Sequence, residues 1–333
     1  MNKSAFNKIA TALLLGTTVS ALLMALPGTS NGAQPIAIHS CTDITTSGSY
    51  KLVADLTGSS NCITIWASNV DLRLNGHTIT GSGTNTLWWG IGVVVQTNVK
   101  IKGPGLITNF AFGVRLNGTD SSEVTEVTAN NNGHGFVVVS DFPDVNNFSE
   151  ENSFKRNTAT GNVSRGFFSE GASNNSFLNN VASDNEVGVF LGVGTGNHVK
   201  GNTTNGNSSI GIGTAGETSN AHTIEDNIAN GNGRGFGIRL GSGSTGNNVN
   251  GNTTINCFIG IALQVSSGNN VNGNTTLNND FGIALIQGST DNNIDGNMAL
   301  DNSLTDLTDD SIACDNNIWT NNVFNTANQT CIQ

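Results

Sequence analysis

Charged side chains are scarce in this sequence, and basic ones are the scarcest. Only 11% of the 333 residues are Asp, Glu, Lys or Arg, and 24 acidic residues outnumber 13 basic ones. The net charge of −11 repels phosphate backbones and anionic lipid surfaces, so we expect no nucleic-acid partner. Low charge with 42 glycines is also a composition of disordered chains, but the regular apolar positions described below argue against disorder.

Long apolar runs are absent after the N-terminus. A basic start, an uncharged apolar run over 9–26 and the small residues 31–33 follow one another in the order typical of a secretory signal peptide. We predict a cleaved signal over residues 1–33 and a mature chain over 34–333. The run is marginal for a membrane span and no stop-transfer charges follow it, so we expect a secreted, periplasmic or cell-surface protein without stable membrane insertion.

Cysteine is also rare, with five residues in all. Cys41 and Cys62 flank the first segment of the mature chain, and Cys314 and Cys331 flank the last. Export leads to an oxidising compartment, so we expect the disulfides Cys41–Cys62 and Cys314–Cys331 to staple the two ends. Cys257 is left over and stands at an Asn position of the repeat described next, which favours a buried, unreactive thiol over a nucleophile.

A helical apolar period is absent, and a longer repeat takes its place. Gly246–Leu263 and Gly268–Leu285 are identical at 14 of 18 positions. An apolar residue precedes each repeated Asn by three positions, from Phe154 to Ile318, and a mostly small residue follows it by two. The repeated Asn residues are Asn157, Asn180, Asn202, Asn227, Asn252, Asn274, Asn297 and Asn321.

This period defines the expected fold. A repeat of 22–25 residues is too short for a strand and a crossover helix, but three short strands separated by turns make one coil of a solenoid. Coils stacked about 4.8 Å apart bury Phe, Val and Ile, while Asn and Gly supply left-handed turn conformations. We predict an all-β, single-domain solenoid of about ten coils with caps at 34–60 and 303–333.

The repeat unit resembles a known family. The N-x-apolar-x-x-N unit Asn292–Asn297, the GIAL element Gly282–Leu285 and the opening segment 71–79 resemble right-handed parallel β-helices of the pectin-lyase-like superfamily, in its PbH1-repeat branch with NosD-like and CASH domains. The resemblance implies a right-handed β-helix. It also implies a polysaccharide or cell-surface glycan as partner, because the superfamily holds pectate lyases, alginate epimerases, phage depolymerases and adhesins.

Charged residues recur at outward positions around the Gly-apolar strands. Lyases and epimerases require a base and cations at a carboxylate, and hydrolases require two carboxyl groups across one bond. The candidate catalytic residues are His134, Arg165, Glu186 and Arg234. The candidate substrate-binding residues are Phe168, Phe190, Arg239 and Glu170. The alternative is a set of solvated residues on a long sheet, with the phenylalanines covered by a loop.

The longest interruption of the repeat is Ser140–Glu151, with Asp141, Asp144, Glu150 and Glu151. It offers a general base or ligands for Ca²⁺, but no D-x-D-x-D-G pattern supports a calcium site, so we predict a surface loop and no cofactor. Three Met residues and no His-rich tract also argue against copper.

Three smaller features carry expectations of their own. The pair Trp88-Trp89 should point to opposite faces of a strand, and packing against a cap is favoured over a sugar platform. His198 and His222 are expected at corresponding turn positions of successive coils. The cluster Asp306, Asp309 and Asp310 is expected in a solvated turn.

The sequence leaves three functions open. The first is an exported, monomeric β-helix that binds extracellular or cell-wall polysaccharide. The second is a polysaccharide lyase, epimerase or hydrolase acting on the outer face of one parallel sheet. The third is a structural or adhesive surface protein. The fold alone does not choose among them, because one fold supports many functions.

Overall fold

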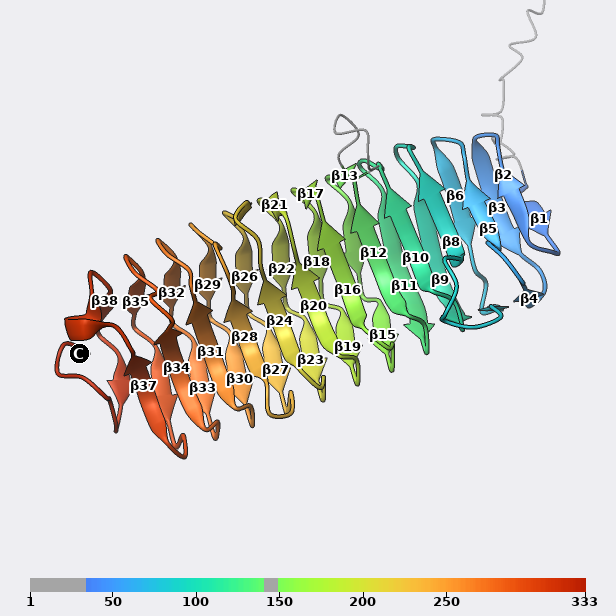
Figure 1. Ribbon diagram of the computed structural model, residues 1–333. Coiled ribbons are helices and arrows are strands. Elements are labelled where there is room, and N and C mark those ends of the chain that lie inside the picture. The colour runs from blue at the N-terminus through green and yellow to red at the C-terminus, as the bar shows by residue number, and fades with distance from the viewer. Residues whose placement is uncertain (1–33, 141–148) are drawn as a thin grey trace, which may run out of the picture. The chain divides into compact units, whose positions relative to one another are not determined.

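The computed structural model describes residues 34–140 and 149–333 (Figure 1). The predicted signal peptide lies outside the described residues. Residues 35–333 form one compact unit. Among the described residues the regular structure is all β apart from one 3-10 turn, Ile312–Cys314, and no helix is long and apolar enough to cross a membrane.

The chain winds into the predicted right-handed parallel solenoid, and one wall is a sheet of twelve parallel strands. These strands are β2 (Thr42–Ile44), β5 (Ile63–Ile65), β8 (Trp89–Val94), β10 (Phe112–Asn117), β12 (His134–Val139), β16 (Arg165–Glu170), β20 (Val187–Leu191), β24 (Ile210–Thr214), β28 (Phe236–Leu240), β31 (Ile259–Gln264), β34 (Phe281–Ile286) and β37 (Thr305–Asp309). The predicted count of about ten coils was therefore too low. The segments predicted as caps contain strands that continue the stack.

The remaining strands form two further rows, joined into one sheet where β9 (Lys100–Thr108) and β11 (Glu123–Asn130) run through both. The first, which we call the ion-pair row, holds β1 (Ile36–Ile38), β3 (Gly48–Leu52), β6 (Val70–Arg73), β14 (Ser153–Lys155), β18 (Ser176–Leu178), β22 (His198–Lys200), β26 (Thr223–Glu225), β29 (Asn248–Asn250), β32 (Asn270–Asn272), β35 (Asn293–Asp295) and β38 (Ile318–Thr320).

The second, which we call the uncharged row, holds β4 (Leu56–Thr57), β7 (Thr78–Thr80), β15 (Thr158–Thr160), β19 (Val181–Ser183), β23 (Thr203–Asn205), β27 (Ile228–Asn230), β30 (Thr253–Ile255), β33 (Thr275–Leu277), β36 (Met298–Leu300) and β39 (Val323–Phe324). Two short pairs complete the described strands: β13 (Ser149–Glu150) with β17 (Ala172–Ser173), and β21 (Gly194–Thr195) with β25 (Ser219–Asn220).

Equivalent apolar residues stack on one another inside the coil, as predicted. The rings of Phe136 and Phe167 lie 4.8 Å apart and nearly parallel, and those of Phe154 and Phe177 lie 5.2 Å apart. The glycine of each Gly-apolar pair is required by close packing rather than by a turn. A Cβ at Gly166 would lie 2.7 Å from the carbonyl oxygen of the next coil.

Columns of buried Asn side chains hold the turns together. The Asn157 backbone N–H donates to Asn180 Oδ1 at 2.9 Å, and Asn157 Nδ2 donates to the Val124 carbonyl at 2.8 Å. Each side chain thus satisfies backbone groups of neighbouring coils, which buried polar groups require. The left-handed conformation belongs to the preceding residue, such as Asn179 with φ 54°, and not to the column Asn.

The last coil shifts the column by one residue from the prediction. Asn322, not Asn321, accepts the hydrogen bond from the Asn297 backbone N–H, at 3.0 Å. Trp319, not Ile318, stacks in register with the inward-facing Ile294, and Ile318 is 57% exposed. Asn321 and Asn322 lie 24 and 25 residues after Asn297, so both fit the repeat of 22–25 residues and the spacing does not choose between them.

His222 and Cys257 both stand at Asn positions of the columns. His222 Nδ1 accepts a hydrogen bond from the Asn197 backbone N–H at 3.1 Å, so His222 stands at an Asn position. His198 pairs in register with Thr223, and the expected correspondence of His198 and His222 is wrong. Cys257 is free and buried, as predicted, and burial raises the pKa of its thiol.

Both predicted disulfides are present, Cys41–Cys62 and Cys314–Cys331. The expectation of a solvated acidic turn at the C-terminal end is wrong for Asp306 and Asp309, which are buried, while Asp310 is exposed. Asp309 Oδ2 accepts from Trp319 Nε1 at 3.1 Å and from Asn317 Nδ2 at 3.0 Å. These carboxylates satisfy N–H groups of the final coil, which has no further coil to pair with.

Candidate functional site

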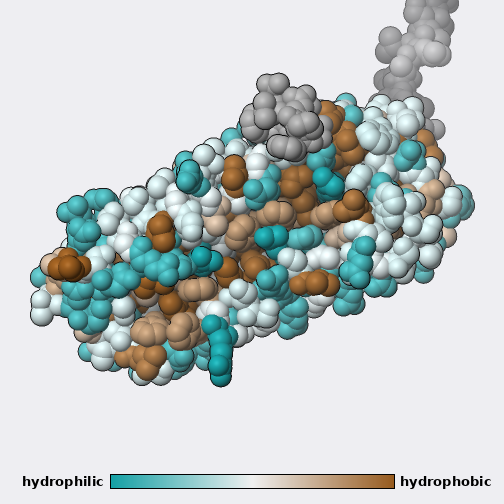
Figure 2. All heavy atoms as spheres, viewed as in Figure 1, coloured by the Kyte–Doolittle hydropathy of each residue, from teal (hydrophilic) through white to brown (hydrophobic). Residues whose placement is uncertain are grey.

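The outer face of the twelve-strand sheet carries two columns of side chains. The first column consists of the residues that begin strands β8 to β37: Trp89, Phe112, His134, Arg165, Val187, Ile210, Phe236, Ile259, Phe281 and Thr305. The second column contains Thr64, Gly92, Arg115, Val137, Phe168, Phe190, Gly213, Arg239, Ala262, Ala284 and Thr308 in register. Figure 2 shows apolar and hydrophilic residues alternating in a band along this face.

Arginine and aromatic rings alternate at the N-terminal end of the band. The Arg115 guanidinium lies 5.6 Å from the Trp89 ring centroid and 5.1 Å from that of Phe112. Cations over aromatic faces are attracted by the ring quadrupole. The three side chains come from the adjacent strands β8 and β10, so the pairing is fixed by the strand register.

The alternation continues through β12, β16 and β20. The His134 ring stacks between Phe112, at 5.6 Å, and Phe168, at 5.8 Å. The Arg165 guanidinium lies 4.2 Å from the Phe168 centroid and 4.9 Å from that of Phe190. Together with the preceding pair, these side chains form a continuous aromatic and cationic surface from β8 to β20, which we call the aromatic strip.

His134 and Arg165 bring unsatisfied polar atoms to the aromatic strip. His134 Nδ1 and Arg165 Nε are buried and have no hydrogen-bond partner among the described residues. Burial, with the charge of Arg165, lowers the pKa of His134 to about 4, so the imidazole is neutral at pH 7. Burial also lowers the pKa of Arg165, whereas the negative charges of Glu186 and Glu170 raise it. Unpaired buried polar atoms cost free energy that a ligand would recover.

Glu170 lies at the end of β16, beside this pair. Burial raises the pKa of its carboxyl, against a hydrogen bond from the Val193 backbone and the charge of Arg165. A Cβ at Gly192 would lie 1.8 Å from Glu170 Oε2, so a glycine there leaves room for the carboxylate. The predicted binding residue Glu170 therefore borders the aromatic strip.

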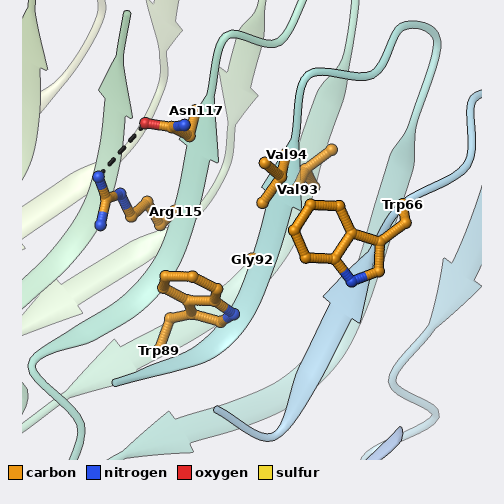
Figure 3. A pocket seen from close by; sticks show the side chains of 7 residues that line it. All are labelled: Trp66, Trp89, Gly92, Val93, Val94, Arg115 and Asn117. Atoms are coloured by element: carbon orange, nitrogen blue, oxygen red, sulfur yellow. Dashed lines mark hydrogen bonds between the residues drawn. The ribbon is translucent and has the colours of Figure 1, made fainter. Parts of the chain in front are cut away.

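A pocket of about 150 Å³ opens between two tryptophans at the start of the aromatic strip (Figure 3). Its lining residues are Trp66, Trp89, Gly92, Val93, Val94, Arg115 and Asn117. Figure 3 shows Gly92 between the two indole rings, with Arg115 Nη2 donating to Asn117 Oδ1 at 3.3 Å. A Cβ at Gly92 would lie 2.3 Å from Trp89 Nε1, so the indole lies against the sheet only because residue 92 is glycine.

Trp88 and Trp89 do not lie on one strand, as the prediction of opposite faces requires. The strand begins at Trp89, while Trp88 belongs to the preceding turn and is 39% exposed. The two rings therefore do not alternate across a strand, and Trp89 lies on the outer face rather than in a cap. This geometry favours the ligand platform over the packing interpretation.

The structure divides the predicted catalytic set. His134 and Arg165 begin neighbouring strands, β12 and β16. Glu186 lies in the turn before β20 and accepts a hydrogen bond from Ser164 Oγ at 3.2 Å. Arg234 is exposed in the turn before β28, where Phe236 takes the first strand position. Arg234 is thus separate from the other three.

The predicted binding residues Phe168, Phe190 and Arg239 share the second column, with Gly213 between Phe190 and Arg239. Four residues of the site were missed: Trp66, Trp89, Phe112 and Arg115. The segment Phe112–Leu116 has the same Gly-apolar element as β12, but it precedes the Asn repeat that guided the prediction.

The acidic interruption contributes little to the described site. Asp141 and Asp144 lie outside the described residues, while Glu150 belongs to β13 and Glu151 Oε2 accepts from Ser121 Oγ at 3.1 Å. Within residues 34–140 and 149–333, no group of three His, Cys, Asp or Glu side chains is placed to hold a metal ion.

Fold and outer face together define a right-handed parallel β-helix with a long aromatic and cationic surface. The chain belongs to the NosD family, whose model, described as periplasmic copper-binding protein (NosD), matches residues 36–221 and 213–332. No curated protein matches the sequence.

Several solved structures share the fold at low sequence identity. The A-module of mannuronan C-5 epimerase AlgE6 from Azotobacter vinelandii aligns with a TM-score of 0.67 at 15% identity, covering 89% of this chain and 92% of that one. The periplasmic alginate epimerase AlgG aligns at 0.55 and 17%, covering 78% and 64%. A tailspike protein mutant of E. coli bacteriophage HK620, in complex with a pentasaccharide, aligns at 0.58 and 18%, covering 86% and 61%.

The described residues do not fit the copper centre that the family description suggests. Copper favours thiolate, thioether and imidazole ligands held together. Four of the five cysteines form disulfides, and the fifth is buried in an Asn column. Both ring nitrogens of His222 contact protein groups, Asn197 N–H at 3.1 Å and Ser219 Oγ at 3.2 Å. We therefore derive no chemistry through copper.

Proposed function

We propose that this protein is an exported, periplasmic β-helix that binds an extended polysaccharide along the aromatic strip. The observation that carries the proposal is the continuous alternation of aromatic rings and cations over the strands β8 to β20. Sugar rings present apolar C–H faces and polar edges. A surface that offers flat rings beside hydrogen-bond donors suits both.

The size of the Trp66–Trp89 pocket supports a chain ligand rather than an enclosed small molecule. Pockets for drug-sized ligands are roughly 300–1,000 Å³. The pocket of about 150 Å³ is smaller, and it opens onto a surface that continues over the next coils. It suits one part of a longer ligand. The carbohydrate-related names of the structural neighbours agree with this ligand class.

A second candidate is catalysis on the same polysaccharide. It is favoured by a neutral imidazole, His134, next to Arg165, and by Glu170 at the other end of strand β16, whose carboxyl has a raised pKa. A base beside a cation is the arrangement that lyases and epimerases require. Catalysis at His134 and Arg165 does not require the exposed Arg234 or Glu186, which lies in the turn before β20.

Both candidates are tested by one panel of soluble polysaccharides. The mature protein is titrated with each, and the same mixtures are assayed for new reducing ends and unsaturated ends. Phe168→Ala should weaken binding, because it removes the ring shared by His134 and Arg165. Product that disappears in His134→Ala and Arg165→Ala would establish catalysis at this site.

The matched control is Phe281→Ala, in the first column of the same sheet but four strands beyond β20. It should bind like the wild type. A panel with no binding would refute the proposed function, and equal losses in Phe168→Ala and Phe281→Ala would place the ligand elsewhere.

A further inference from the structure

The uncharged row differs from the rest of the surface. Its outward positions in the described strands from β7 to β39 carry Thr, Asn, Ser and apolar residues, with no Asp, Glu, Lys or Arg. The ion-pair row next to it is built on the same coils and carries paired charges. Lys102–Asp71, Lys155–Glu123 and Lys200–Glu225 lie within 2.7–3.2 Å.

Large apolar residues gather at the C-terminal end of the uncharged row. These residues, which we call the apolar patch, are Ile228, Ile255, Leu277, Met298, Leu300 and Val323, on strands β27 to β39. Ile228 is 46% exposed, Met298 38% and Val323 56%. Apolar residues grouped on one face are typical of an interaction surface, whereas single ones need no explanation.

We infer that the apolar patch pairs with the same patch of a second copy of this chain. The protein is strongly acidic, so most surfaces of two copies repel each other. A two-fold contact places a patch against itself, so a charge near the symmetry axis lies opposite the same charge of the second copy. A surface without charges avoids that opposition. The acidic residues Asp226, Asp280 and Asp301 lie in the turns that bound the patch and not at its outward strand positions.

Two other occupants fit the patch less well. No outward position of the described uncharged row is aromatic, so it lacks the rings that would stack on sugars. It also offers no cation to attract anionic lipid. A second copy needs neither, because apolar contact alone supplies the attraction.

The length of the apolar patch determines how tightly two copies are expected to bind. Five coils at a spacing of about 4.8 Å extend over about 20–25 Å. Standard stable interfaces bury about 800 Å² on each partner, and a strip of this length with two columns falls below that. We therefore expect a reversible dimer that forms as the protein concentration rises.

Sedimentation velocity of the mature protein over a range of concentrations tests the inference. The wild type should shift toward twice the monomer mass. Leu277→Asp and Met298→Asp should remain monomeric, because each would bury an unpaired charge in the apolar contact. The control Asn272→Asp adds the same charge to β32 of the ion-pair row in the same coil as Leu277, and it should dimerise like the wild type.

Circular dichroism melting identifies a variant that fails to fold. If Leu277→Asp unfolds, Met298→Asp decides, because its side chain is more exposed. A wild type that stays monomeric at all concentrations overturns the inference. A dimer that survives both substitutions, or one that Asn272→Asp also abolishes, overturns it as well.

Discussion

The two halves of the twelve-strand sheet share one backbone and present different outer faces. Over β8 to β20 the outward side chains alternate between rings and cations, and buried His134 Nδ1 and Arg165 Nε have no hydrogen-bond partner in the described part of the chain. Over β28 to β34 the outward residues Ile259, Ala262 and Ala284 are buried beneath Phe236 and Phe281. Strands β31 and β34 thus cover their own apolar surface, while β28 holds a single cation over a ring, with Arg239 5.4 Å from the Phe236 centroid.

One half of the sheet packs its outer face for stability, and the other half carries the candidate site. The C-terminal half holds the two most similar repeats, and there the small residues Ala262 and Ala284 let large neighbours lie over them. In the N-terminal half Gly92 also lies under Trp89, but Arg115 and Phe168 stand in the same column and are too large to be covered in this way. The more regular half is therefore the self-contained one, and the irregular half is the candidate site.

The largest effect should come from Phe168→Ala. The ring contacts both His134 and Arg165, so its loss breaks the aromatic strip in the middle. Central aromatic contacts are typically worth 2 kcal/mol or more, so we expect the affinity for the bound polysaccharide to fall about 30-fold or more. Isothermal titration measures the change. Unaltered affinity would show that the rings are not contacted.

A smaller but more specific effect should come from Gly92→Ala. The added methyl group displaces the Trp89 indole, and we expect about a tenfold loss of affinity with little change in melting temperature. Gly213→Ala is the matched control, because its Cβ would lie 3.2 Å or more from Ile210 and Phe190. If both variants bind equally, the Trp89 platform does not contribute.

Acid should destabilise the fold through its buried imidazoles. Burial lowers the pKa of His222 to about 4, below the ordinary value of 6.5, so between these values the unfolded state binds the proton more tightly. Stability is therefore full above pH 6.5 and falls toward pH 4, by on the order of 3 kcal/mol for this group. His222→Asn, which restores the column residue, should flatten that slope in denaturant titrations. An unchanged slope would contradict this assignment.

The smallest effect should come from Arg234→Ala. The guanidinium is exposed in a turn outside the aromatic strip, so binding should stay within about twofold of wild type. The same titrations measure it. A loss as large as that of Arg165→Ala would restore the site as the sequence predicts it and remove the distinction between the two halves.

The fold was predictable because identical residues stack on themselves. Each Asn and each Phe or Ile of the repeat occupies a column, so the spacing along the chain carries the geometry. The predicted coil count was too low because the first coils lack the Asn repeat. The last column residue was misassigned because Asn321 and Asn322 both fit the spacing from Asn297.

The site was predictable only in part. Spacing identified His134, Arg165, Phe168 and Phe190 through the Gly-apolar element. Glu186 and Arg234 lie in the turns before the strands rather than on them, because one turn residue separates Asn185 from β20 while three separate Asn232 from β28. Turn length decides which residue begins the strand, and the repeat does not encode it. Contacts across coils, such as Arg115 over Trp89, are likewise invisible along the chain.

Hydroxyl-radical footprinting with and without a saturating polysaccharide tests the central claim most directly, because it compares both halves in one molecule. We predict that Trp89, Phe112 and Phe168 become protected from oxidation while Phe236, Phe258 and Phe281 do not. Equal protection of both sets, or protection of the second set alone, would contradict the assignment of the aromatic strip as the binding surface.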